Sequence, residues 1–184
     1  SVSIKALMEP LKLAARDGSS TSTSPFVLIM HDWSKLNYKT HESKNDKVQL
    51  THKNDVGYDL TASLAVDASN GVPLAPVAMQ LRTSKRLITT MSKRSKLIAK
   101  HLDQIEPVMD EVADMQLGRT PVHIIDREAD SLGHFRQWVP KGHLILIRCD
   151  DRRVKWNGES VLLSEIMDKM DSECLYQDAG EALK

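Results

Sequence analysis

The order of hydrophobic and polar positions along the chain predicts a mixed α/β domain. A continuous apolar run indicates a buried strand, and alternation with a period of two indicates a strand with one buried face. By these two patterns the predicted strands cover residues 26–30, 58–67, 72–81, 122–126 and 143–149. The second and third strands are joined at Asn70-Gly71, which is a strong hairpin turn. Residues 34–55 are polar and mixed in charge, and we expect a long loop or an exposed ribbon there.

Apolar residues spaced three and four apart predict the helices. These patterns cover residues 1–18, residues 87–117 with a kink or a new start at Pro107, and residues 132–139. Beyond residue 150 we expect a ribbon that turns at Asn157-Gly158, followed by a short helix within residues 163–170.

The connections between these elements predict how the strands are ordered in the sheet. The first three strands follow one another through loops or turns and are expected to pair antiparallel, whereas the last two follow helices and are expected to join in parallel by right-handed crossovers. This is the order of a ribonuclease-H-like mixed five-stranded sheet flanked by helices. We therefore predict a helix and linker over 1–23, a partial ribonuclease-H-like core over 24–150, and the start of an inserted region over 151–184.

Such a sheet places its first and fourth strands side by side, and an aspartate follows the apolar run of each. Asp32 and Asp126 are therefore predicted to meet at the carboxyl ends of these strands. Two carboxylates about 4 Å apart repel by about 4 kcal/mol at an effective dielectric near 20. A divalent cation such as Mg²⁺ offsets this repulsion and is commonly bound by one or two carboxylates. The alternative is that each aspartate forms a turn or caps a helix.

Two motifs resemble the catalytic core of bacterial insertion-sequence DDE transposases, which are cut-and-paste enzymes with a ribonuclease-H-like fold. The first is His31-Asp32-Trp33-Ser34-Lys35-Leu36-Asn37-Tyr38, which is similar to the family pattern Asp-x-(Thr/Ser)-x-Leu-x-Tyr. The second is Asp126-Arg127-Glu128-Ala129-Asp130. The resemblance implies that Asp32 and Asp126 are catalytic ligands of Mg²⁺ or Mn²⁺. It also implies a metal-dependent hydrolysis of phosphodiesters and a strand transfer at transposon ends, with DNA as the partner and a homodimer of the full-length protein.

The sequence departs from this family at the third acidic ligand. The family has a glutamate on a late helix, within the signature Tyr-x-x-Arg-x-x-x-Glu-x-x-x-x-x-x-Lys, and this signature does not occur in the sequence. We therefore expect a fragment that is inactive by itself. Two alternatives stay open: a catalytically inactive ribonuclease-H-like module that binds DNA or protein, and another two-metal nuclease.

Charge is balanced over the chain as a whole, with 25 basic and 25 acidic residues, but it is segregated locally. Residues 82–100 contain seven basic residues and no acidic ones, while residues 103–114 contain five acidic residues and no basic ones. A solvated face is one interpretation of the basic stretch, and a surface for the DNA backbone is the other. The residues predicted to bind nucleic acid are Arg127, Lys93, Arg94 and Lys96. With no apolar run long enough to span a bilayer, we expect a soluble, intracellular protein and no membrane partner. The resemblance to bacterial transposases implies a cytoplasmic, nucleoid-associated one.

Overall fold

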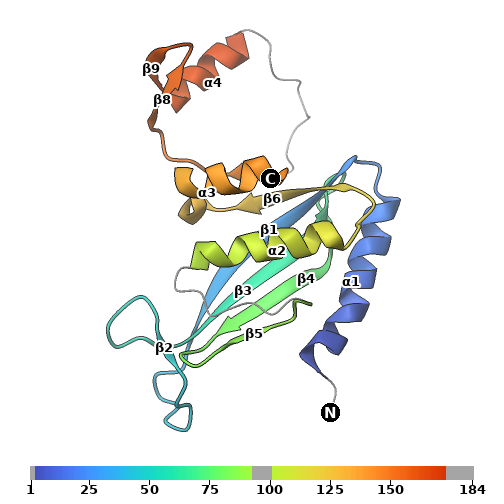
Figure 1. Cartoon of the computed structure of the whole chain (residues 1–184), viewed down its shortest axis with the longest axis vertical. Helices are drawn as coiled ribbons and strands as arrows, with labels where there is room; N and C mark the ends of the chain where they lie inside the picture. The colour runs from blue at the N-terminus through green and yellow to red at the C-terminus, as the bar shows by residue number, and fades with distance from the viewer. Residues whose placement is uncertain (1–2, 93–100, 173–184) are drawn as a thin grey trace. The chain divides into compact units, whose positions relative to one another are not determined.

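A mixed β-sheet is the centre of the first of two units into which the chain divides, Ser1–Arg148 and Cys149–Lys184 (Figure 1). The computed structural model describes residues 3–92 and 101–172. In this part of the chain the sheet has the order β5-β4-β3-β1-β6-β7, and β2 pairs with β3. The strands are β1 (Phe26–Asn37), β2 (Val48–Gln49), β3 (Val56–Asp67), β4 (Pro73–Arg82), β5 (Leu87–Thr89), β6 (Thr120–Ile125) and β7 (Leu144–Ile147).

The pairing of the strands confirms the predicted ribonuclease-H-like sheet. β1, β3 and β4 pair antiparallel in succession, β6 joins β1 in parallel, and β7 joins β6 in parallel. The short strands β2 and β5 extend the five predicted strands. β1 is longer than predicted, because its pairing with β3 continues to Asn37 instead of stopping after the apolar run.

The helices of the first unit pack on one face of the sheet. They are α1 (Ile4–Thr21), η1 (His101–Gln104), α2 (Ile105–Asp114), η2 (Arg127–Ala129), α3 (Leu132–Trp138) and η3 (Val139–Lys141). Two clusters of buried side chains lie between the helices and this face. One joins α1 and α2 to Val27 and Ile29 of β1, and the other joins α2 and α3 to Ile125 of β6. The opposite face of β1, β6 and β7 presents apolar side chains that are partly exposed, namely Phe26, Met30, Leu144 and Leu146.

Two predicted helix boundaries are wrong, and a third is confirmed. α1 continues past Gly18 to Thr21, and a Cβ atom at Gly18 would lie 2.8 Å from Leu74, so this glycine serves close packing instead of ending the helix. Residues 87–89 form β5, not a helix, because they pair with β4. The new helix start expected at Pro107 is confirmed to within two residues: α2 begins at Ile105, and Pro107 lies in its first turn, where a missing N–H leaves no helical bond unmade.

The second unit contains a two-stranded ribbon and a helix. β8 (Arg153–Trp156) and β9 (Glu159–Leu162) pair antiparallel, and α4 (Leu163–Ser172) follows. The turn falls on Asn157 and Gly158, both with positive φ, as predicted for this pair of residues. Among the described residues no helix combines the length and the apolarity needed to cross a membrane.

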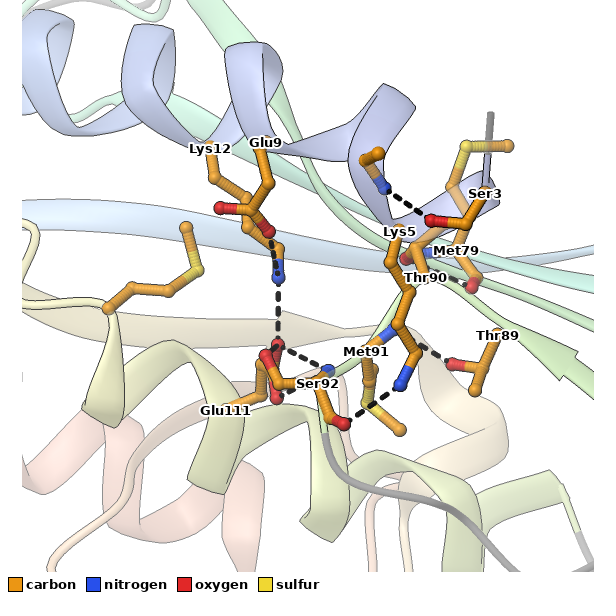
Figure 2. A network of polar contacts seen from close by, with 12 residues as sticks. Ser3, Lys5, Glu9, Lys12, Met79, Thr89, Thr90, Met91, Ser92 and Glu111 are labelled. Atoms are coloured by element: carbon orange, nitrogen blue, oxygen red, sulfur yellow. Dashed lines mark hydrogen bonds and ion pairs between the residues drawn. The ribbon is translucent and has the colours of Figure 1, made fainter. Parts of the chain in front are cut away.

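A buried carboxylate fastens α1 and α2 to the segment that follows β5 (Figure 2). Glu111 of α2 accepts hydrogen bonds from Lys12 of α1 (2.8 Å) and from the backbone and hydroxyl of Ser92 (3.0 and 2.7 Å). Lys5 also donates to the carbonyl oxygen of Ser92. Burial by itself raises the pKa of Glu111, but the hydrogen bonds from Lys12 and Ser92 outweigh burial and hold the pKa below its usual value.

The Glu111→Gln substitution is expected to destabilise the fold by about 3 kcal/mol, because it removes the buried counter-charge of Lys12 and leaves its largely buried ammonium group with the exposed carboxylate of Glu9 alone. Urea unfolding at neutral pH measures this loss. Glu9→Gln is the matched control: Glu9 also contacts Lys12, at 3.5 Å, but its side chain is 62% exposed. We expect little change there. Equal losses in the two variants would contradict the role assigned to Glu111.

Candidate functional site

The pairing of β1 with β6 brings the two predicted aspartates onto one face of the sheet. The last paired residues are Met30 and Ile124. Because side chains alternate between faces, Asp32 and Asp126, each two residues further on, share the face of Met30 and Ile124. The two aspartates lie beyond the last paired residues, and both line the same depression. This is the open face of the sheet, and both aspartates are exposed.

A depression of about 610 Å³ surrounds the two aspartates. Its floor is apolar, with Met30 and Ile124 beside the carboxylates. The remaining lining residues are His31, Ile125, Leu146, Ile147 and Arg148. The two carboxylates thus line an open depression together with several apolar side chains.

The local backbone differs between the two positions. Asp126 follows β6 directly and precedes η2, and its Oδ1 accepts a hydrogen bond from the backbone N–H of Glu128 at 2.9 Å. The capping role considered for this residue is therefore present. Asp32 was expected at the end of a strand, and that expectation is wrong: Asp32 lies within β1, opposite Ala62 of β3. The pairing of β1 with β6 does end close to Asp32, at Met30. Beyond Met30, the edge of β1 on the side of β6 is therefore no longer paired with β6.

Arg148 is a further residue of this depression, and the sequence analysis did not select it. The pairing of Ile125 with Ile147 places Arg148 beside Asp126 at the end of β7, and Arg148 lines the same depression. A guanidinium group next to two carboxylates is suited to a phosphate oxygen. The sequence could have indicated Arg148, because this residue directly follows the apolar run of β7, just as Asp126 directly follows the apolar run of β6.

The other predicted nucleic-acid residues lie apart from this depression or outside the described part of the chain. Arg127 is exposed in η2, one residue after Asp126, and does not line the depression. Lys93, Arg94 and Lys96 lie outside the described residues. Their proposed role in binding DNA stays a prediction.

A pair of buried histidines joins β1 to β6 directly beneath the aspartates. His31 and His123 are hydrogen-bonded through Nε2 and Nδ1 at 2.9 Å, with stacked rings, and His31 Nδ1 also bonds to the hydroxyl of Ser63 on β3 at 2.8 Å. His31 is buried, on the face of the sheet opposite Asp32. Burial, and next the neighbouring His123, lower the pKa of His31 to about 3; burial, and next His143, lower the pKa of His123 to about 3. Both rings are therefore neutral at physiological pH.

The residues at this site suit a hard divalent cation. Asp32 and Asp126 offer carboxylate oxygens, and the second oxygen of Asp126 is not engaged by the Glu128 N–H. Mg²⁺ is commonly bound through one or two carboxylates and keeps several waters. Within residues 3–92 and 101–172, no group of three or more His, Cys, Asp and Glu side chains is placed to hold a metal ion. Asp32 and Asp126 would therefore hold such an ion as a pair.

Comparison with family models gives no match, and comparison with curated proteins gives none either. Among solved structures, the chain is similar to the Drosophila P element transposase strand transfer complex, with 9% identity, a TM-score of 0.35 and coverage of 86% of this chain and 38% of that one. It is also similar to Ciona intestinalis Endonuclease V in complex with a 24mer DNA containing an inosine followed by a ribo-adenosine. There the identity is 9%, the TM-score 0.37, and the coverage 92% of this chain and 66% of that one. Likenesses this remote do not support an argument about function.

The histidine pair makes stability depend on pH above the range in which carboxylates titrate. When folding lowers the pKa of a base, the unfolded chain takes up a proton at a higher pH than the folded protein does. The stabilisation is therefore complete above the unfolded pKa of 6.5 and is lost as the pH falls toward 3. We expect the free energy of unfolding to fall by on the order of 1 kcal/mol per pH unit for each histidine below about pH 6.

Urea unfolding between about pH 8 and about pH 5 measures this slope. His123→Phe removes one titrating ring and is expected to reduce the slope by about half. His52→Gln, which changes an exposed histidine, is the control and is expected to keep the slope of the wild type. An unchanged slope in His123→Phe would show that the buried pair does not cause the pH dependence.

Proposed function

We propose that the first unit is the core of an enzyme that acts on DNA phosphodiesters with the help of a divalent metal, and that the enzyme is a DDE transposase. One observation supports the proposal most: Asp32 and Asp126, far apart in the sequence, share one face and one depression through the pairing of β1 with β6. A bound Mg²⁺ or Mn²⁺ would supply an activated water and would stabilise the leaving oxygen of a phosphodiester.

The side chains of the site have separate tasks in this proposal. Asp32 and Asp126 hold the metal, and Arg148 at the edge of the depression binds a non-bridging phosphate oxygen of the substrate. The apolar floor at Met30 and Ile124 limits the water around the reacting phosphate. The described residues offer two carboxylates and no third metal-binding group at this site. The proposed catalysis therefore requires a third carboxylate in addition to Asp32 and Asp126. Metal binding is what we expect of this chain by itself.

A second candidate is a catalytically inactive module of the same fold that binds DNA or a protein. The hydrogen bond from the Glu128 N–H to Asp126 favours it, because this bond gives Asp126 a structural task that needs no metal. Metal affinity distinguishes the two candidates.

Isothermal titration with Mn²⁺ tests the proposal on the chain as it is. We expect weak binding by the wild type, and a loss of roughly tenfold or more in Asp32→Asn and in Asp126→Asn, since even the loss of an outer-shell partner of a metal site costs that much. Asparagine keeps an oxygen acceptor for the Glu128 N–H, so Asp126→Asn removes the charge while the cap remains.

Asp17→Asn, at an exposed position of α1, is the matched control and is expected to bind Mn²⁺ like the wild type. If Mn²⁺ does not bind the wild type, or binds all four proteins equally, the metal site is rejected. The inactive module is then the better interpretation.

A further inference from the structure

A basic arm projects from the end of the sheet where β1 ends (Figure 1). We define it as residues 38–55, which connect β1 to β3 through β2, together with the turn at residues 83–86 between β4 and β5. The two parts contact each other: the backbone N–H of Ser84 donates to the carbonyl oxygen of Asp46 (2.8 Å), and Lys85 donates to the side chain of Asn45 (3.1 Å).

The arm is positively charged although the chain as a whole is neutral. It contains six basic and three acidic side chains, a net charge of +3. The charges are also sorted by exposure. Among the acidic residues, Asp46 and Asp55 are partly buried. Exposed to solvent are four basic residues, Lys39, Lys53, Lys85 and Arg86, and one acidic residue, Glu42. The surface that a partner meets is therefore more positive than the composition indicates.

The interior of the arm is held by polar contacts that use the side chain of Asp46 and two of its lysines. The hydroxyl of Tyr58 donates to Asp46 at 2.6 Å, and this bond, together with the charges of Lys85 and Arg86, lowers the pKa of Asp46. Lys47 donates to backbone carbonyl oxygens within the arm, and Lys44 lies 4.9 Å above the ring of Tyr38.

The base of the arm is fixed by a close approach of two strands. A Cβ atom at Gly57 would lie 1.9 Å from the carbonyl oxygen of Leu36, so only glycine allows β1 and β3 to meet there. The exposed cations are thus presented on a preformed support, and little order has to be gained on binding.

We propose that this basic arm binds the phosphate backbone of duplex DNA, beside the DNA held at Asp32 and Asp126. The inference rests on the proposed function for the choice of partner. Asn37, at the base of the arm, is five positions beyond Asp32 along β1, which is about 17 Å of strand. At about 3.4 Å per base pair, the arm would contact phosphates about five base pairs from the phosphate at the aspartates. One straight duplex can therefore reach both places.

Fluorescence anisotropy with a labelled duplex of about 20 base pairs tests the proposal, in EDTA so that no metal contributes. Lys53→Gln/Arg86→Gln is expected to weaken binding about tenfold at low salt. It is also expected to reduce the slope of log affinity against log salt by about 2, because two phosphate contacts are lost. Arg136→Gln/Lys155→Gln is the matched control: it also removes one exposed arginine and one exposed lysine, outside the arm, and is expected to keep the affinity and slope of the wild type.

Equal losses in the two double variants would overturn the proposal, and so would a wild type that does not bind. Polyglutamate that competes as well as DNA at equal charge, or duplex RNA that binds more tightly than DNA, would overturn the choice of DNA as the partner. The variant Asp32→Asn/Asp126→Asn is expected to bind DNA in EDTA at least as well as the wild type. If DNA binding depends on the arm but the wild type has no affinity for Mn²⁺, the role of the arm is supported and the metal site is rejected. If the wild type binds Mn²⁺ but DNA binding does not depend on the arm, the role of the arm alone is rejected.

Discussion

The parallel pairing of β1 with β6 is the constraint on which the candidate site depends. A slip of one residue in this pairing would move one aspartate to the other face of the sheet, because side chains alternate. The buried bond between His31 and His123 specifies the register, since both rings lose their partner when the strands shift. Ser63 of β3 is hydrogen-bonded to the other ring nitrogen of His31, so two buried polar contacts connect three adjacent strands.

The strand order and the pair of aspartates could be predicted from the sequence because both follow from local patterns. The alternation over residues 58–67 and the turn at Asn70-Gly71 specify the hairpin of β3 and β4. The helical segments before β6 and β7 then require parallel connections. Once that order is given, the aspartates that follow two apolar runs have to lie on neighbouring strands.

The remaining features depend on contacts between distant residues, which a pattern in one segment does not contain. β1 continues through polar residues to Asn37 because β3 lies beside it over its whole length, and this hid the position of Asp32 within a strand. Arg148 faces the aspartates only through the register of β7. The composition of the arm indicated a mixed charge, and it did not show which charges are exposed. The partly buried place of Asp46 depends on its hydrogen bond with Tyr58, which belongs to another segment of the chain.

The separation between the arm and the aspartates has an electrostatic consequence. Two carboxylates without a metal repel a phosphate, so most of the affinity for DNA has to come from cations elsewhere on the protein. Arg148 already lies beside Asp126, and further cations there would compete with a metal ion for the carboxylate oxygens. About 17 Å is more than the Debye length of about 8 Å at physiological salt, so the charges of the arm are largely screened at Asp32 and Asp126. The arm is thus far enough away to leave the metal affinity of the aspartates intact, and near enough to hold the same duplex.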